Sequence, residues 1–319
     1  MSIPVCYIAY SRIDKCKQTL EALCECIGIE DTEIFIFSDA PHNSSMEKKV
    51  KEVRFFLQEF IKENDLLNIH LIEHEKNKGS FRTIVDGLQY VLQDSESVIL
   101  VEEDVLVGKS FLIYMNQALN FYRNDAKVFC VSGYNPVRCM KSSGDVFLSE
   151  RLCCFGLGIW KDRFVNVCWN KKELPLNTID RVYFNRIAKD ISACFWDDLH
   201  KKTYFETSWD IVLFYNMLLN DKRQVIPIMS YCTNIGFDGS GEWSTKGCFI
   251  NNNFIQHYIK TKFKFGSYYL APKEQDEYFR GFIQDNFQKK LLRIGRIGAS
   301  IMHLESVAEK IKRRLFVER

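Results

Sequence analysis

Three consecutive carboxylates follow an apolar run in the segment Val98-Ile-Leu-Val-Glu-Glu-Asp104. Like charges placed side by side repel one another unless a cation compensates them. Hard divalent cations such as Mg²⁺ or Mn²⁺ bind carboxylate oxygens and commonly share their coordination with substrate phosphates. We therefore interpret Glu102, Glu103 and Asp104 as a candidate metal site. The alternative is an acidic loop that is simply exposed to solvent.

Other polar residues come directly after apolar runs in the same half of the chain. Asp39 follows the run Ile34–Phe37 and could accept hydrogen bonds from a base or a ribose, although an Asp before Ala-Pro is equally a turn residue. Arg12 follows the first apolar run, and Lys78 and Arg82 lie further along. These cations could meet phosphate charge, and each alone is also typical of a protein surface.

A second candidate acid lies in Ser208-Trp209-Asp210. Asp210 could act as a general base, with Trp209 as an apolar wall for a sugar ring. The alternative is a helix start capped by Ser208 or Asp210, with the tryptophan buried. The rival acid pair is Asp197-Asp198.

Two glycine-containing segments could approach a ligand. Gly156-Leu157-Gly158 would let the backbone come close to a bound molecule, or form an ordinary turn. The segment Asn234–Gly241, which contains Ser240, has too many small and polar residues for a packed element. It suits a loop that closes on substrate, or a long turn.

Twelve cysteines and six histidines do not form a recognisable metal or catalytic pattern. No CxxC occurs, and the closest pairs are Cys24/Cys26 and Cys153/Cys154. Most of the cysteines lie in apolar runs, where a free thiol behaves as a small hydrophobic group. We expect reduced, buried thiols, as in a reducing compartment.

The elements that position these residues alternate in type along the first half of the chain. Short apolar runs predict strands buried on both faces, and three-to-four-residue apolar spacing predicts the helices between them. This alternation predicts an α/β fold with a doubly wound, mainly parallel sheet, whose ligands bind at the carboxyl ends of the strands. The strands are expected at Pro4–Ala9, Ile34–Phe37, Ile69–Ile72, Val98–Val101 and Val128–Ser132, and the helices at Lys15–Cys26, Met46–Lys62, Ser80–Leu92 and Ser110–Tyr122.

The second half is less regular, with a helix expected near Trp209–Leu219 and a strand at Val225–Met229. Because no linker rich in Pro, Gly or Ser interrupts the chain, we expect one domain over 1–285, with halves at 1–135 and 136–285. Residues 286–319 are predicted to form a basic amphipathic helical tail. That helix could pack on its own domain, form a dimer seam or lie on anionic lipid.

Composition restricts the class of protein. The 319 residues are 46% hydrophobic and 26% charged, as in an ordinary globular protein, and the net charge is only +2. A broad basic face for nucleic acid is therefore not expected. The longest stretch without Asp, Glu, Lys or Arg has 14 residues, whereas a membrane-spanning helix needs about 20 apolar ones. With no recognisable signal peptide, a cytoplasmic location is expected, with peripheral contact to the inner membrane face as a further option.

Taken in order, these segments resemble nucleotide-sugar glycosyltransferases of the GT-A fold, in particular the inverting N-acetylglucosaminyltransferase I group and bacterial GT-A sugar transferases. The resemblance covers about residues 3–245 and leaves the tail outside. It depends on Ile8-Ala-Tyr-Ser-Arg12, Phe37-Ser-Asp39, Val101-Glu-Glu-Asp104 with Lys109-Ser-Phe111, Phe155-Gly-Leu-Gly158, Ser208-Trp-Asp210 and Pro227.

The resemblance implies a role for each residue of the nucleotide half. Asp104 would be the direct ligand of Mn²⁺ or Mg²⁺. Glu102 and Glu103 would contact the donor sugar or the ribose, Asp39 the uracil, and Arg12 the nucleotide. Glu103 departs from the family pattern, which has Asp at this position.

The resemblance also assigns the donor-sugar and acceptor half. Leu157 and Trp209 would line the donor-sugar pocket, flanked by Gly156 and Gly158. Asp210 would be the catalytic base. Ser240 would lie in the loop that closes over the diphosphate. Ile211 replaces a second acid that the family often has after this position.

The implied activity is inverting, metal-dependent transfer of a sugar (N-acetylglucosamine or another hexose) from a UDP-sugar to a hydroxyl of a glycan acceptor. A lipid-linked acceptor would suit a basic tail that contacts the membrane. One alternative is a sugar-nucleotide nucleotidyltransferase, which normally has a Gly-rich basic loop where this chain has Tyr-Ser-Arg-Ile-Asp14. Another is a carbohydrate-binding scaffold that keeps the fold without catalysis.

Overall fold

A computed structural model describes residues 2–137, 143–170, 173–175, 178–188, 208–236 and 259–281. The chain forms two compact units, one of residues 1–167 with 222–269 and the other of 168–221 with 270–319. These boundaries differ from the predicted halves at 1–135 and 136–285. The predicted tail helix lies outside the described residues.

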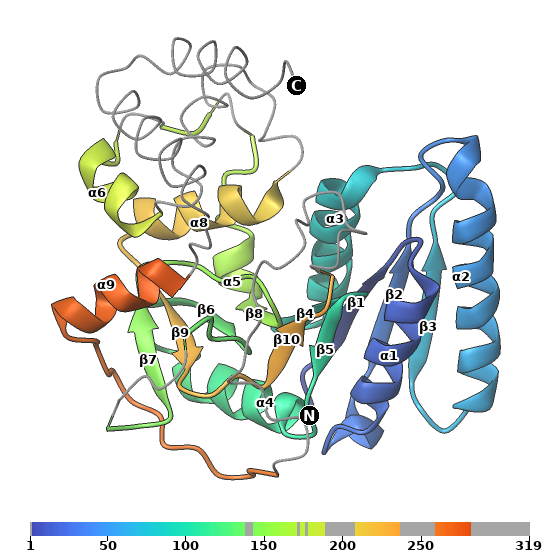
Figure 1. The fold of residues 1–319 in the computed structure, drawn as a ribbon, viewed down its shortest axis with the longest axis horizontal. Coiled ribbons are helices and arrows are strands. Elements are labelled where there is room, and N and C mark those ends of the chain that lie inside the picture. Colours follow the sequence, from blue (N-terminus) through green and yellow to red (C-terminus); the bar gives the residue numbers. More distant parts are fainter. Residues whose placement is uncertain are drawn as a thin grey trace, which may run out of the picture. The chain divides into compact units, whose positions relative to one another are not determined.

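The first unit is built on an eight-stranded sheet with the order β3-β2-β1-β4-β8-β6-β9-β7 (Figure 1). Strands β1 to β4 pair in parallel, as do β6 and β9, whereas β8 and β7 run antiparallel to their neighbours. The predicted doubly wound, mainly parallel α/β sheet is therefore confirmed. The strands are β1 Val5–Ala9, β2 Ile34–Ser38, β3 Ile69–Glu73, β4 Ser97–Glu102, β6 Val128–Ser132, β7 Val146–Ser149, β8 Leu157–Trp160 and β9 Arg223–Pro227.

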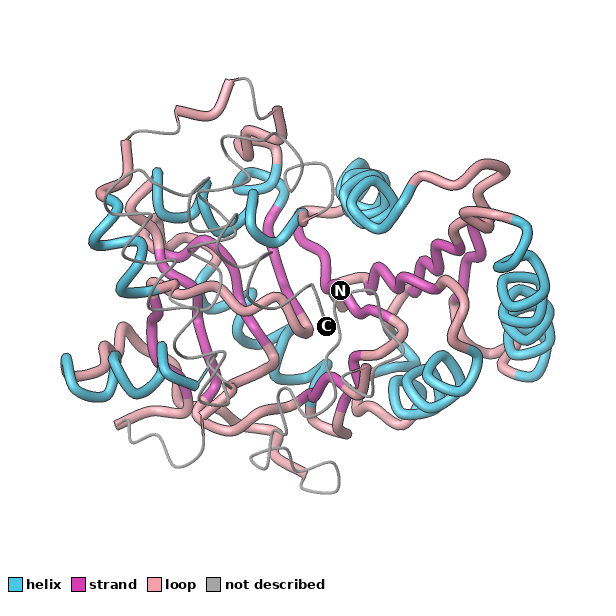
Figure 2. Tube along the Cα trace, turned by 45° about the horizontal axis from the view of Figure 1, so that its top comes forward, coloured by secondary structure: helices cyan, strands magenta, loops and turns pink. Residues whose placement is uncertain are grey.

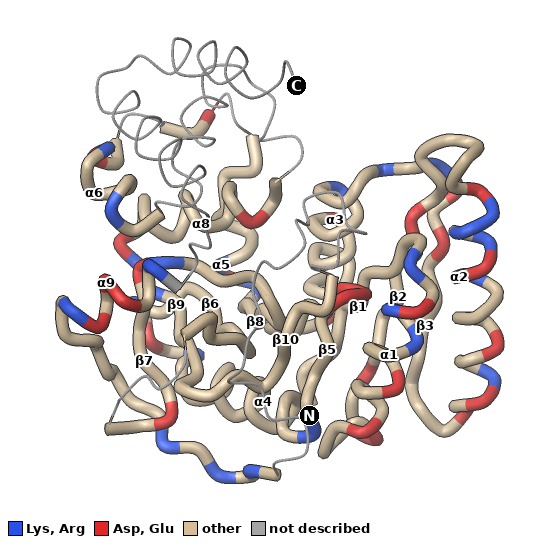
Figure 3. Tube along the Cα trace, viewed as in Figure 1, with Lys and Arg blue, Asp and Glu red and all other residues tan. Residues whose placement is uncertain are grey.

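Amphipathic helices cover both faces of this sheet. Figure 2 shows α3 on one side of strands β1 to β3, and α1 with α2 on the other. Apolar residues spaced by three or four positions face the sheet, as Cys16, Leu20 and Leu23 do in α1. Charged residues gather on the helices, α2 above all, and are sparse on the strands (Figure 3). The helices are α1 Ile13–Cys24, α2 Ser44–Glu63, α3 Gly79–Asp94 and α4 Phe111–Tyr122, with the short η1 Ile29–Asp31 and α5 Lys161–Phe164.

Strand β3 corrects one expectation. The run Ile69–Ile72 was predicted to be buried on both faces, but β3 is the outer strand of the sheet and none of its residues is fully buried. His70 is exposed and pairs with Glu33 across 2.8 Å. β3 has β2 as its one neighbour in this sheet, and its open edge stays in contact with solvent, whereas β7 at the opposite end of the sheet is buried.

A two-stranded antiparallel sheet adjoins the acidic end of β4. It joins β5 (Val105–Val107) to β10 (Cys232–Asn234). Glu103 and Asp104 are the two residues between β4 and β5, so they form the turn that links the two sheets. Residues more than 120 positions apart are thereby brought to one place.

The second unit contains α6 (Arg181–Ile187), α8 (Trp209–Leu219) and α9 (Pro272–Gly281). The predicted helix at Trp209–Leu219 matches α8. Nine of its residues are buried, and its Phe214 packs against Phe184 of α6 with ring centres 5.6 Å apart. No helix among the described residues is long and apolar enough to span a membrane.

The described cysteines agree with the expectation of reduced, buried thiols. All nine that lie in described residues are free, and six of them are buried. Burial raises the pKa of Cys16 to about 12, and raises the pKa of Cys26 to about 12 as well. Because the thiolate is the reactive form, these thiols are poor nucleophiles at neutral pH.

Candidate active site

One arginine joins two carboxylates at the carboxyl ends of β1 and β4. These strands pair in parallel, with Ile8 opposite Glu102, so the segments that follow them meet at one edge of the sheet. Arg12 donates from Nε to Glu103 Oε1 at 2.7 Å and from Nη2 to Asp104 Oδ2 at 2.9 Å. The structure thus brings together three of the predicted site residues. We call Glu103 and Asp104 the acid pair.

Glu103 is the more deeply placed member of the acid pair. It is 4% exposed, and its second oxygen accepts a hydrogen bond from the backbone N–H of Tyr10 at 2.7 Å. Burial raises the pKa of Glu103, and the nearby Arg12 opposes that rise. Burial also disfavours the charged guanidinium, but Asp104 and Glu103 outweigh this effect and raise the pKa of Arg12 further. Arg12 is therefore a permanent positive charge beside the pair.

The end of β10 closes over the acid pair. The backbone N–H of Ile235 donates to the carbonyl oxygen of Asp104 at 2.8 Å. A Cβ atom at Gly236 would lie 2.1 Å from Asp104 Oδ2 and 2.9 Å from Arg12 Nη1. Only a glycine leaves room for both side chains here. The rest of the predicted closing loop, Ser240 included, lies outside the described residues.

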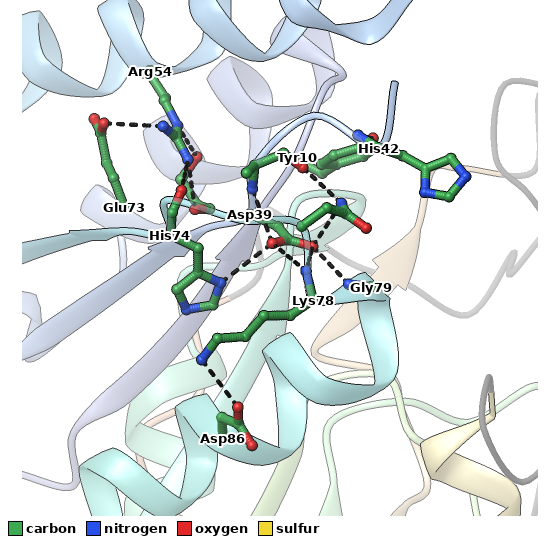
Figure 4. A network of polar contacts seen from close by, with 12 residues as sticks. Tyr10, Asp39, His42, Arg54, Glu73, His74, Lys78, Gly79 and Asp86 are labelled. Atoms are coloured by element: carbon green, nitrogen blue, oxygen red, sulfur yellow. Dashed lines mark hydrogen bonds and ion pairs between the residues drawn. The ribbon is translucent and has the colours of Figure 1, made fainter. Parts of the chain in front are cut away.

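Asp39 is the centre of a second polar network (Figure 4). It follows β2, is 4% exposed, and faces the N-terminus of α3. A carboxylate at a helix N-terminus stabilises the unpaired N–H groups found there. Its two oxygens accept from the backbone N–H of Ala40 (2.9 Å), Lys78 (3.0 Å) and Gly79 (2.9 Å), and contact Asn77 Nδ2 at 3.0 Å and His74 Nδ1 at 3.3 Å.

The surroundings of this network hold Asp39 in place. Arg54 donates to the carbonyl oxygens of His74, at 2.8 Å, and Ser38, at 3.2 Å, and so ties the ends of β2 and β3 together. These contacts give Asp39 the turn-forming role that was the alternative interpretation of the sequence. Its contact with uracil stays a prediction.

The other two predicted phosphate-binding cations lie on or beside α3. Lys78 is exposed and pairs with Asp86 across 3.0 Å. Arg82 is also exposed and lies over the ring of Phe81, 5.8 Å from its centre. Among the described residues, neither cation contacts the acid pair, so Arg12 is the predicted cation that reaches it.

The glycines near β8 make room for the protein's own side chains. Gly156 has φ +60°, and a Cβ there would lie 2.7 Å from the ring of Phe111. A Cβ at Gly158 would lie 2.7 Å from the end of Met115. Leu157 between them is fully buried. Helix α4 fills this space, and the predicted donor-sugar contacts of these three residues remain predictions.

Trp209 and Asp210 open helix α8 in the second unit. Trp209 is 5% exposed, whereas Asp210 is partly exposed. Ser208 precedes the helix without capping it through its side chain, but the helix start and the buried tryptophan agree with the alternative interpretation, and the role of Asp210 as a base stays a prediction. An acid in the first turn is still favourable to the helix dipole. The rival pair Asp197-Asp198 lies outside the described residues.

The donors at the acid pair fit a cation that is shared with phosphates. Asp104 offers hard oxygen ligands and its side chain is 15% exposed, while Glu103 and Glu102 add negative charge beside it. In the described part of the chain no group of three His, Cys, Asp or Glu residues could hold a metal. Mg²⁺-type ions are commonly bound by one or two carboxylates and completed by water and substrate phosphate. The residues suit that kind of site and not a closed cage of side chains.

Three contributors to this site could not be identified from the sequence. Tyr10 acts through its backbone N–H, Thr19 through a hydroxyl 3.2 Å from the carbonyl oxygen of Glu103, and Gly236 through its missing side chain. None of these roles depends on a residue type that signals chemistry. The segment Ile8-Ala-Tyr-Ser-Arg12 and the Gly-rich composition around Gly236 pointed to these regions, but not to the roles of the individual residues.

The comparisons with known proteins concern the fold. No protein-family model and no curated protein matches this chain. A mannosyltransferase, PcManGT from Pyrobaculum calidifontis in complex with GDP-Man and Mn²⁺, is 15% identical over 50% of this chain and 45% of its own, with a TM-score of 0.36. TarS of S. aureus is 15% identical over 73% and 36%, with a TM-score of 0.38.

GalNAc-T7, in a structure with UDP, GalNAc and Mn²⁺, is 10% identical over 71% of this chain and 42% of its own, with a TM-score of 0.45. This chain spans less than half the length of each of the three proteins. The doubly wound, mainly parallel sheet, with an acidic turn after a central strand, is the α/β architecture that the sequence predicted. Activity has to be inferred from the site itself.

Proposed function

We propose that this chain is a glycosyltransferase that uses a nucleotide-sugar donor. The observation that carries the proposal is the junction of Arg12 with Glu103 and Asp104 at the carboxyl edge of a parallel sheet. A permanent cation beside two acids is suited to a ligand that brings negative phosphate charge, together with a divalent cation. Such edges are where doubly wound sheets bind their ligands.

The donor that we propose is a UDP-hexose, with UDP-N-acetylglucosamine as the first candidate, and the acceptor is a hydroxyl of a glycan, free or lipid-linked. Asp104 would hold Mn²⁺ or Mg²⁺, with Glu102 and Glu103 near the ribose or donor sugar. A metal bound there would neutralise charge on the departing nucleoside diphosphate.

The chain's own residues have defined tasks in this reaction. The guanidinium of Arg12 binds and stabilises the diphosphate as it leaves. Asp210 removes the proton from the acceptor hydroxyl, whose oxygen attacks the anomeric carbon on the face opposite the diphosphate. The bond from that carbon to the phosphate oxygen breaks, and its electron pair leaves with the nucleotide. A single displacement of this kind inverts the anomeric configuration. General-base assistance is typically worth about 10²- to 10⁴-fold in rate.

The first experiment is thermal unfolding with UDP, GDP, CMP and TDP, each with and without Mn²⁺. A ligand that binds the folded state raises the melting temperature by mass action. We expect a rise with UDP that requires Mn²⁺. A rise in melting temperature with another nucleotide would support a glycosyltransferase whose donor carries that nucleotide in place of UDP. No rise with any nucleotide would contradict the proposal and favour a scaffold without catalysis.

A further inference from the structure

The two arms of Arg12 are not equivalent. Its Nε binds Glu103, whose side chain is 6% exposed, and its Nη2 binds Asp104, whose side chain is 15% exposed. Glu103 is also fixed by the backbone N–H of Tyr10. Arg12 itself is 23% exposed and so is the most accessible of the three. The contact with Asp104 is thus the one that can open while the contact with Glu103 stays.

Arg12 and a divalent cation would compete for one carboxylate. Asp104 Oδ2 already accepts a charge-assisted hydrogen bond of 2.9 Å. A cation held by Asp104 would lie beside the guanidinium of Arg12, and two positive charges in adjacent positions repel each other. Gly236 lies against both partners of this contact, since a Cβ there would clash with Asp104 Oδ2 and with Arg12 Nη1.

We propose that Arg12 is the resting counter-ion of the acid pair, and that it must release Asp104 before a divalent cation is held there. This inference rests on the proposed function, since the nucleotide diphosphate is the ligand that draws the guanidinium away. Arg12 is thereby a positioning residue that couples the two ligands. The diphosphate strengthens cation binding, and the cation strengthens nucleotide binding by the same factor.

Cation binding without nucleotide is the decisive measurement, because no diphosphate is then present to move Arg12. The signal of free Mn²⁺ in electron paramagnetic resonance gives the affinity directly. We expect Arg12→Gln to bind Mn²⁺ more tightly than the unmodified chain, by a factor in the usual range of coupling between sites, about 5- to 150-fold. Arg12→Lys keeps a point charge that cannot span both carboxylates, and it should give an intermediate affinity.

Arg223→Gln is the matched control. Arg223 lies in the same unit and pairs with Glu150 across 2.8 Å, with side chains 19% and 22% exposed. The substitution Arg223→Gln removes one positive charge from a different ion pair, as Arg12→Gln does at the acid pair, and should leave Mn²⁺ affinity unchanged. Circular dichroism checks that the variants fold. If Arg12→Gln does not fold, the Mn²⁺ affinity of Arg12→Lys is compared with that of the unmodified chain instead.

The inference is overturned if folded Arg12→Gln binds Mn²⁺ no more tightly than the unmodified chain does. If only Arg12→Lys folds, the same criterion applies to that variant. A gain in Mn²⁺ affinity in Arg223→Gln as large as the gain in Arg12→Gln would also overturn it. The proposed function fails separately. It fails if the unmodified chain shows no Mn²⁺-dependent binding of UDP or of any other nucleotide, whatever the Arg12 variants do with Mn²⁺ alone.

Discussion

At the scale of single residues, Asp39 is a structural anchor whatever ligand it meets. Its buried carboxylate accepts three backbone N–H groups and holds the start of α3 against the end of β2. We expect Asp39→Ala to lower the free energy of unfolding by about 3 kcal/mol, because several buried donors lose their charged acceptor. Urea denaturation measures this change.

Asp86→Ala is the control for that substitution. Asp86 pairs with Lys78 at an exposed position, so its loss should change stability by less than about 1 kcal/mol. A stability of Asp39→Ala equal to that of the unmodified chain would contradict the anchoring role.

The proposed general base makes a kinetic prediction. Asp210→Asn should reduce sugar transfer by about 10²- to 10⁴-fold, since the amide cannot accept the hydroxyl proton. Binding of UDP should persist, as measured by the Mn²⁺-dependent shift in melting temperature. Asp221→Asn, beyond the other end of α8, should keep full turnover. Unchanged turnover in Asp210→Asn would remove this residue from the mechanism.

Glu103 predicts a pH dependence of stability. Its pKa is raised in the folded state by burial, so the folded chain binds this proton more tightly than the unfolded chain does. Its contribution to the free energy of unfolding is therefore largest at low pH and falls as the pH rises from about 4.5, the ordinary value, through the raised pKa. Glu103→Gln should flatten that fall in urea unfolding measured between pH 4 and 8. Identical pH profiles would contradict the prediction.

At the scale of elements, the end of β10 shapes the acid pair. Gly236→Ala would place a Cβ 2.1 Å from Asp104 Oδ2, so the carboxylate or the strand end must move. We expect Mn²⁺-dependent UDP binding to weaken by about tenfold or more, because each 1.4 kcal/mol of lost binding energy corresponds to a factor of ten. Isothermal titration measures it. Gly266→Ala, whose Cβ would have its nearest contacts with the side chain of Tyr268, should bind UDP normally.

The sequence was sufficient to predict the elements of the first half to within about two residues at each end. The runs that became β1, β2, β4 and β6 are continuously apolar, and such runs become buried strands whatever their order. The order itself was not predictable, which is why β3 was wrongly expected to be buried on both faces. Strands β5 and β10 were not predicted, because each is only three residues long and forms by pairing with the other, which lies far away in the sequence.

The same limit applies to the site. Arg12, Glu103 and Asp104 were each predicted from their position after a strand, but the bridge between them depends on the register of β1 with β4. Asp39 was predicted either to meet a ligand or to form a turn, and the sequence did not decide between these roles because it does not reveal that the backbone of residues 78 and 79 returns to this side chain.

At the scale of the whole molecule, charge is distributed unevenly along the chain. Residues 289–319 contain nine basic and three acidic residues, a net charge of +6, which leaves −4 for the rest of the chain. We expect the full chain to sediment with vesicles that contain anionic lipid, since each basic residue near such a surface contributes about 1 kcal/mol. Deleting residues 286–319 should abolish this binding, and 0.5 M salt should weaken it. Equal binding after deletion would exclude the tail as the lipid contact.

The position of β8 in the sequence determines when β4, the strand that leads into the acid pair, can gain its second neighbour. β4 ends at Glu102, yet one of its two neighbours is β8, which begins 55 residues later at Leu157. Strand β6 in turn pairs with β9, which begins only at Arg223. A chain emerging from the ribosome, or a fragment cut at residue 135, therefore exposes an unpaired edge on the strand that leads into the acid pair. Exposed edges of this kind template aggregation. We expect such a fragment to be insoluble, and the nascent chain to depend on chaperones until residue 227 has emerged.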